Sequence, residues 1–136
     1  MADTFQLEVA TPERLLVNEQ VTEAEIPGKD GYMGILAGHA PLLSALAPGL
    51  LTYGTGGNKQ VLVVDGGFVE VFENHVRVLA DHAEPANEVQ ADAARRQLDE
   101  ANKALREAQD EQSSNAALKK LQEAQARLDA AEGRSH

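Results

Sequence analysis

The 136-residue chain contains no cysteine and no tryptophan, and its only aromatic residues are three phenylalanines and two tyrosines. The absence of cysteine excludes disulfides, thiolate metal sites and cysteine nucleophiles, and it fits a reducing compartment. Few rings are present to stack on sugars or bases. The core must therefore come mainly from valine, leucine and isoleucine.

Positive charge is also scarce, since 12 Lys and Arg face 22 Asp and Glu and the formal net charge is -10. Such a surface repels nucleic acid and anionic lipid headgroups. The chain has no apolar run of about 18 residues that could span a membrane. No signal or transit peptide is visible at the N-terminal end. We therefore expect no nucleic-acid binding and no direct membrane insertion, and we expect the protein to work where it is made.

Residue patterns that carry catalytic chemistry are missing as well. The four histidines show no metal-ligand spacing; they are His39, His75, His82 and His136. The serines lack a nucleophile-elbow context. Gly66-Gly67 follows a predicted strand but opens another strand, which favours a tight bend or bulge over a phosphate loop. We expect no catalytic residues, no metal site and no cofactor.

The composition changes sharply at Pro85. All prolines, all aromatics and all but one of the eleven glycines lie at or before it, and an Ala-, Glu- and Gln-rich tail follows. Glycine and proline punctuate short strands, whereas Ala-rich segments without them favour helix. The sequence thus predicts two parts, a β-rich module at 1–85 and a helical module at 86–136.

The first module reads as short strands separated by glycine-rich turns. Val61 to Val64 is continuously apolar and is expected to be buried on both faces. Phe68 to Phe72 and Val76 to Ala80 form a predicted hairpin around Asn74-His75. The other predicted strands lie at 5–9, 22–26, 32–36 and 50–53. Short strands at such spacing predict a β-sandwich or a flattened barrel.

The second module reads as two antiparallel helices. Asn87 is the expected N-cap, with Gln90 three residues later as in a capping box. The 113–115 segment (SSN) supplies the expected loop between the helices and the N-cap of the second helix. Each helix carries an alternating Ala/Leu seam; the seams are Ala94, Leu98, Ala101, Leu105, Ala108 and Ala117, Leu121, Ala124, Leu128, Ala131. Because these seams contain so few leucines, the hairpin is expected to be marginal alone and to dock on a neighbour or open.

The helical module holds most of the basic residues, which makes them available to an acidic partner. The alternative is a solvated helix face with intrahelical pairs such as Glu123–Arg127.

A second distinctive stretch is GYMGILAGHAPLL, residues 31–43. It could present Tyr32 and His39 at a sandwich edge, or it could be a structural corner in which backbone groups satisfy His39.

Three strings, in order, carry a resemblance to a known family. They are VATPER at 9–14, GYMGILAGHAPLLSALAPGLL at 31–51 and GGFVEVFENHVRVLAD at 66–81, and the Ala-rich hairpin follows them. Together they resemble the epsilon subunit of the bacterial F-type ATP synthase. The resemblance covers nearly the whole chain.

The resemblance implies an N-terminal all-β sandwich of about ten strands, followed by a mobile two-helix regulatory hairpin. It implies a non-catalytic rotor subunit in the central stalk, bound to the gamma subunit and the c-ring. Such a subunit helps couple ring rotation to the catalytic head. The helices would also contact the alpha and beta subunits when they extend and inhibit ATP hydrolysis. The expected place is peripheral, on the cytoplasmic face of the bacterial inner membrane.

Particular residues follow from the resemblance. The family's c-ring-facing loops match Lys29, Asp30, Gly31, Tyr32 and His39. Many members carry an acidic or amide residue at the position of Tyr32, so the contact chemistry there differs. Lys119, Lys120 and Arg127 match basic residues that meet acidic surfaces of the catalytic subunits, where charge attraction favours docking.

Two other functions stay open. One is a free-standing binding module with a coiled-coil tail that forms a homo-oligomer, although the seams are shorter than the three or four heptads that a sustained coiled coil needs. The other is a sandwich enzyme with a histidine metal site, which metal analysis would test.

We predict weak or absent ATP binding. Some bacterial members bind ATP through an Ile/Leu-Asp-x-x-Arg-Ala motif, in whose acidic and arginine positions this chain has Gln90 and Ala93. Arg127 matches one second-helix arginine of that site, and its companion position holds Glu123. Without those charges, phosphate recognition is poor. Thermal melting with millimolar ATP checks this, and a marked rise in the melting temperature of the hairpin would contradict it.

Overall fold

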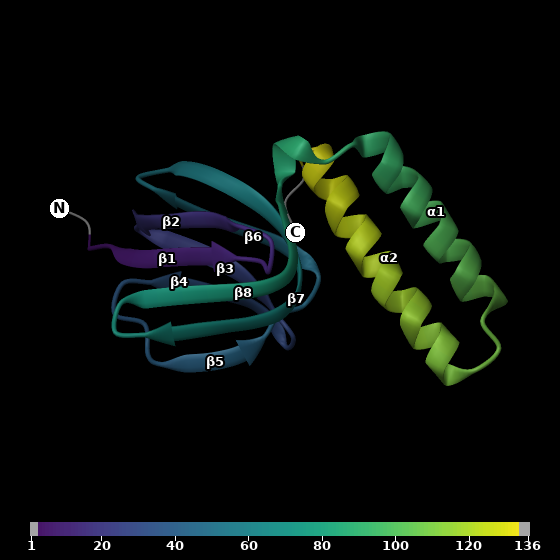
Figure 1. Ribbon diagram of the computed structural model, residues 1–136, viewed down its shortest axis with the longest axis horizontal. Coiled ribbons are helices and arrows are strands. Elements are labelled where there is room, and N and C mark those ends of the chain that lie inside the picture. The colour runs from purple at the N-terminus through teal and green to yellow at the C-terminus, as the bar shows by residue number, and fades with distance from the viewer. Residues whose placement is uncertain (1–2, 134–136) are drawn as a thin grey trace.

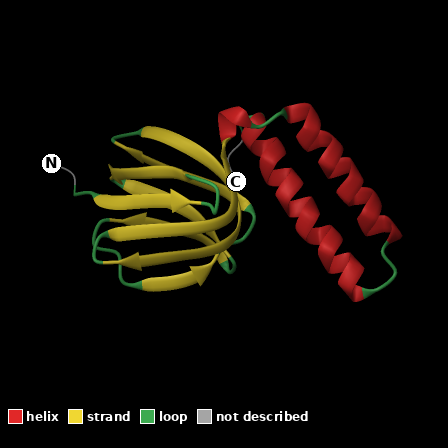
Figure 2. Ribbon diagram, in the orientation of Figure 1, coloured by secondary structure: helices red, strands yellow, loops and turns green. Residues whose placement is uncertain are grey.

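The computed structural model describes residues 3–133, in which eight strands form a β body and two helices lie against one side of it (Figures 1 and 2). The strands are β1 (Phe5–Ala10), β2 (Leu15–Val21), β3 (Glu23–Gly28), β4 (Gly31–Leu36), β5 (Leu42–Ala45), β6 (Gly49–Thr55), β7 (Asn58–Phe72) and β8 (His75–Pro85). His136, one of the four histidines considered above, lies outside the described residues.

The strands form two facing layers that share β7 and β8. The hydrogen-bonded order is β2-β1-β8-β7-β6-β3-β4, and β5 also pairs with β7. The first half of β7 pairs with β6, and its second half pairs with β5. β1 lies parallel to β8, whereas the other strand pairs are antiparallel. The predicted β-sandwich is confirmed.

The predicted strand count differs from the observed one. The resemblance implies about ten strands, but 61–64 and 68–72, predicted as separate strands, lie within the single 15-residue β7. β2 and β5 were not among the strands predicted from the sequence. In β2 only Val17 and Val21 are buried, which is too sparse a pattern to signal a strand by periodicity alone.

A bend at Gly66-Gly67 lets β7 pass from one layer to the other. Both glycines have positive φ, 67° and 101°. The ladder to β8 keeps one register across them, because Asp65 pairs with His82 and Gly67 pairs with Ala80. The bend therefore adds no residue to the strand, and of the two predicted possibilities it is a bend and not a bulge.

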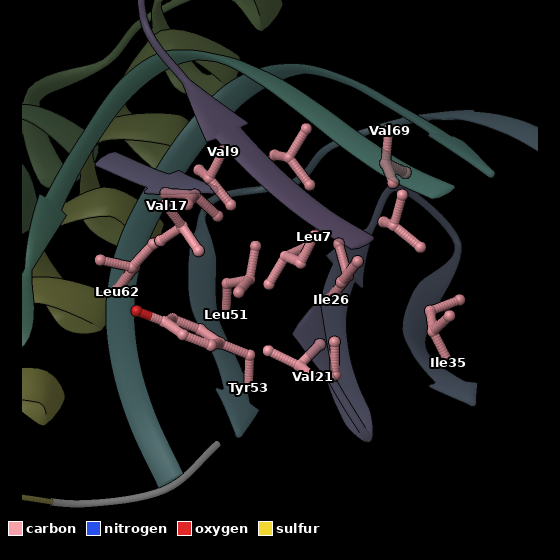
Figure 3. Packing of buried hydrophobic residues seen from close by; sticks show 14 of the residues in the cluster. Leu7, Val9, Val17, Val21, Ile26, Ile35, Leu51, Tyr53, Leu62 and Val69 are labelled. Carbon is pink, nitrogen blue, oxygen red and sulfur yellow. The ribbon is translucent and has the colours of Figure 1, made fainter. Parts of the chain in front are cut away.

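Period-2 alternation fills the space between the layers with aliphatic side chains (Figure 3). Phe5, Leu7 and Val9 of β1 are buried there, as their alternation with polar residues predicts. All buried residues of this core come from strands or strand connections, and none comes from the helices. The sandwich core is thus complete without the helical module.

The β7–β8 hairpin turns one residue earlier than predicted. Glu73 and Asn74 have positive φ, 43° and 57°, and form the two-residue turn. His75 pairs with Phe72 and already belongs to β8. Asparagine tolerates this left-handed backbone better than histidine does, which explains the position of the turn.

The two helices are α1 (Ala91–Glu107) and α2 (Glu111–Ala131), preceded by a short 3-10 turn, η1 (Ala86–Glu88). Two predicted caps are wrong. Asn87 lies inside η1, and Gln90 is the N-cap of α1 without a side-chain cap bond. The loop falls at 108–110, and Asp110 caps α2 in a capping box with Ser113. The Asp110 carboxylate accepts more strongly than a serine hydroxyl, so the helix starts before the 113–115 segment.

The hairpin packs against the outer face of β6 and β7 (Figure 1). Leu50 and Val63 of the sandwich are buried in one cluster with Ala126 and Ala130 of α2, which lie off the predicted seam. Within the predicted seams the buried members are four alanines and one leucine: Ala94, Ala101, Ala117, Ala124 and Leu128. Because 61–64 contacts the core on one side and the hairpin on the other, the predicted burial on both faces is confirmed.

We expect Gly67→Ala to lower the free energy of unfolding by at least about 3 kcal/mol. An added Cβ would lie 2.0 Å from the carbonyl oxygen of Leu79, and the positive φ disfavours any side chain. The matched control is Gly34→Ala, where nothing lies within 4 Å of the added atom. Its effect should stay within about 1 kcal/mol. Urea unfolding measures both, and equal stabilities of the two variants would contradict the role of the bend.

Candidate functional site

An apolar row crosses the outer face of the layer formed by β5, β7, β8, β1 and β2. Its members are cross-strand partners in successive ladders: Ala45, Phe68, Leu79, Ala10 and Leu15. The three large side chains, Phe68, Leu79 and Leu15, are 57%, 52% and 54% exposed. Scattered exposed leucines are ordinary, but a continuous row of this kind marks an interaction surface.

The strand alternation that builds the core also produces the apolar row. Val69 and Val78, the immediate neighbours of Phe68 and Leu79, point inward and are fully buried. The partners Phe68 and Leu79 must therefore point out on the same face. At this row the strands carry apolar side chains on both faces, and the outer ones are exposed.

A charged row runs beside the apolar row, two residues further along the strands. Arg77 lies between Glu8 and Glu70, at 3.5 Å and 3.8 Å. Leu43, 70% exposed, pairs with Glu70 at the end of this row. The outer face thus offers an apolar contact strip with a polar border, which is the usual anatomy of a protein–protein interface.

The structure separates the residues that the resemblance assigns to the c-ring. Lys29 and Asp30 form the turn before β4, and Gly31 and Tyr32 begin that strand. His39 follows the other end of the same strand. A six-residue strand spans roughly 17–20 Å. These residues therefore form two sites and not one patch in this conformation of the chain.

His39 belongs to a structural corner. Its ring Nδ1 lies 2.8 Å from the carbonyl oxygen of Ala40. The preceding residue, Gly38, has a positive φ and donates its N–H to Oδ1 of Asn74 at 2.6 Å. These bonds tie the 37–41 loop to the tip of the β7–β8 hairpin and satisfy His39 through the backbone.

Tyr32 lies beside the hairpin. Its hydroxyl oxygen accepts a hydrogen bond from the N–H of Leu50 at 3.1 Å, and burial raises the pKa of Tyr32. Gly49 leaves the room for this contact, because an added Cβ would lie 2.7 Å from the tyrosine oxygen. Tyr32 also lines a cavity of about 480 Å³ with Leu98 of α1 and Leu121 of α2.

Of the three basic residues assigned to inhibitory contacts, one forms hydrogen bonds within this chain and two are exposed. Arg127 Nε donates to Glu84 Oε1 of β8 at 2.7 Å, and its Nη1 donates to Gln97 Oε1 of α1. Arg127 thereby joins both helices to the sandwich, and it does so in place of the intrahelical Glu123–Arg127 pair considered above. Lys119 and Lys120 are exposed on α2.

A second cavity, of about 440 Å³, lies between the hairpin, the middle of β7 and the end of β8. Its charged lining is mainly acidic: Glu13, Asp65, Glu84 and Glu123, with Arg14 and Arg127. Both arginines are paired with glutamates. A triphosphate placed here would face mainly carboxylates, and weak ATP binding stays a prediction.

Within residues 3–133, no group of three or more His, Asp or Glu side chains is arranged to hold a metal ion. Over the same residues, no helix is long and apolar enough to cross a membrane.

The comparisons with known proteins agree with this architecture. The family model of the ATP synthase delta/epsilon chain β-sandwich domain matches residues 4–86. An ATP synthase epsilon chain from Solibacter usitatus is 59% identical over 99 residues, which cover 73% of this chain and 74% of the relative. The chain belongs to the ATP synthase epsilon family. An epsilon chain from Anaeromyxobacter dehalogenans is 40% identical over 123 residues, which cover 90% of this chain and 93% of the relative.

Solved structures extend the likeness of this epsilon-family chain to the helices. A chain in the Euglena gracilis mitochondrial ATP synthase, solved with its OSCP, F1 and c-ring parts, has a TM-score of 0.81 and 29% identity. The match covers 94% of this chain and 81% of the Euglena chain. A central-stalk and c-ring structure from Tetrahymena thermophila, at TM-score 0.72 and 17% identity, shares the fold. As a member of this family, the chain is a non-catalytic subunit.

Sequence reasoning missed the apolar row. Phe68 and Leu79 were placed in predicted strands, but their adjacency depends on the register of the β7–β8 ladder. The tight turn at Glu73-Asn74 fixes that register, so a correct assignment of the turn would have revealed the pair. Leu15 could not have been found in this way, because it joins the row through the parallel β1–β8 pairing.

We expect Arg127→Gln to weaken docking of the hairpin by about 1 kcal/mol, because the ion pair with Glu84 is lost. Amide hydrogen exchange in the second half of α2 should then be roughly fivefold faster. Lys120→Gln, an exposed change on the same helix, is the control and should leave exchange unchanged. Equal exchange in the two variants would show that Arg127 does not hold the hairpin.

Proposed function

We propose that this chain is a rotor subunit in the central stalk of a proton-translocating F-type ATP synthase, in which it helps couple c-ring rotation to the catalytic head. The apolar row is the observation that supports this. It gives the sandwich an exposed surface suited to a permanent partner, which in this family's setting is the gamma subunit. The complex would hold the chain peripherally, on the cytoplasmic face of the bacterial inner membrane.

The residues at the two ends of β4 are proposed to contact the c-ring. His39 and the 37–41 loop sit at one end, away from the hairpin, whereas Lys29 to Tyr32 sit beside it. Tyr32 is held by Leu50 and is next to α1 and α2 while the hairpin is docked. A contact of Tyr32 with the c-ring would therefore be sensitive to the position of the hairpin.

The helical module, 86–136, is proposed to be mobile and regulatory. Alanines, one leucine (Leu128) and a few polar contacts hold it on the sandwich, and the sandwich core is complete without it. In the extended state its basic residues Lys119, Lys120 and Arg127 would face the alpha and beta subunits and inhibit ATP hydrolysis. Because Arg127 is paired with Glu84 in the docked state, docking and inhibition compete for this side chain.

We expect Leu79→Gln to weaken binding to the gamma subunit by roughly ten- to a hundredfold, since burial of one leucine is worth about 1.5–3 kcal/mol. Leu36→Gln is the matched control, because Leu36 is 63% exposed on β4 and lies outside the apolar row. Titration of purified gamma subunit with the two variants measures the difference. If both variants bind as the parent chain does, the apolar row is not the gamma-binding surface.

Removing residues 86–136 tests the regulatory part separately. The assembled complex with the truncated chain should hydrolyse ATP faster than the complex with the full chain, because the inhibitory segment is gone. An ATPase assay of both complexes measures this. An unchanged rate would remove the inhibitory role and leave the stalk role intact.

A further inference from the structure

The contact between α2 and the sandwich contains a carboxyl pair that neither the stalk role nor the inhibitory role requires. Lys119, Glu123 and Arg127 follow one another at four-residue spacing and so share one face of α2. On the sandwich side, Asp65 of β7 and His82 of β8 are direct cross-strand partners. Glu123 and Asp65 both line the cavity between the hairpin and the sandwich.

The carboxyl groups of Glu123 and Asp65 lie within hydrogen-bonding reach of each other. One oxygen of Asp65, Oδ1, is buried and has no hydrogen-bond donor among the described groups. Two ionised carboxylates are both acceptors and repel each other, whereas one proton between them converts the pair into donor and acceptor. The geometry therefore suits a pair that shares one proton.

The surroundings favour the protonated form of Glu123. Burial, the hydrogen bond to Asp65 and the negative charge of Asp65 raise the pKa of Glu123 above its ordinary value of 4.5, while Lys119 and His82 act in the opposite direction. Arg127 is directed to Glu84 and Gln97. The charged and titratable groups that line the two cavities around Glu123 are Glu13, Arg14, Asp65, His82, Glu84, Glu100, Lys120 and Arg127.

We propose that a proton shared by Glu123 and Asp65 clamps the hairpin on the sandwich, and that loss of this proton releases the hairpin. The clamp depends only on contacts within this chain. Its use as a regulatory step rests on the proposed function, since a released hairpin is the state that would reach the catalytic subunits. Acidification would then hold the hairpin away from those subunits.

The sign of the pH dependence follows from the raised pKa. In the released hairpin Glu123 is solvated and titrates near 4.5. The stabilisation of docking is complete below that pH and is lost as the pH rises through the raised pKa of the docked state. Because one proton is involved, the ratio of docked to released chain falls by up to about tenfold for each pH unit in this window.

Fluorescence energy transfer in the isolated full-length chain tests the clamp. The chain has no cysteine, so Gln60→Cys on β7 and Gln109→Cys between the helices provide the only two labelling sites, both at exposed positions. We expect the transfer signal of the docked state to be lost as the pH is raised from 4.5 to 8. Glu123→Gln should abolish this transition and keep the hairpin docked, because the amide donates to Asp65 as the protonated acid does.

His82→Gln is the control for the imidazole that lines the same cavity, because a protonated imidazole would also attract the two carboxylates. The transition should persist in His82→Gln and should be absent in both Glu123→Gln and Asp65→Asn. A transition that survives Glu123→Gln, or that vanishes only in His82→Gln, would overturn the shared-proton clamp. The readout needs no partner subunit, so it is independent of gamma binding and of ATPase inhibition.

Discussion

The bend of β7 at Gly66-Gly67 is the constraint on which both candidate surfaces depend. An added Cβ at Gly67 would lie 2.0 Å from the carbonyl oxygen of Leu79, so the two strands can turn together only where no side chain intervenes. Asp65, just before the bend, faces the hairpin, and Phe68, just after it, belongs to the apolar row. One pair of strands thereby connects the hairpin contact with the proposed partner surface through an antiparallel ladder.

The two surfaces differ in the kind of interaction that they offer. The apolar row presents large side chains on a stiff sheet, which suits a lasting contact. The hairpin contact instead uses alanines and Leu128 around Leu50 and Val63, one ion pair between Arg127 and Glu84, and a carboxyl pair. Small apolar areas and titratable groups contribute little each, so this contact is suited to opening and closing. The proposed rotor subunit with a movable helical segment would need both kinds of contact.

Much of the architecture could be predicted from residue patterns. The break at Pro85, the alternation of Phe5, Leu7 and Val9, and the Ala-rich seams each report a local property, namely backbone propensity or burial period. The predictions failed where two local signals compete. The start of α2 is an example, because Asp110 and not Ser113 is the N-cap. Ser113 instead completes the capping box at the third position of the helix.

The sequence by itself determined the β-sandwich, the helical pair and the family, because these follow from periodicity, composition and ordered motifs along the chain. Only the tertiary structure decided that Phe68, Leu79 and Leu15 form one row, that Tyr32 and His39 lie apart, and that Glu123 meets Asp65. Each of these relations joins residues far apart in the chain. They depend on strand register and on the docking of α2, and neither is encoded in the spacing of the residues involved.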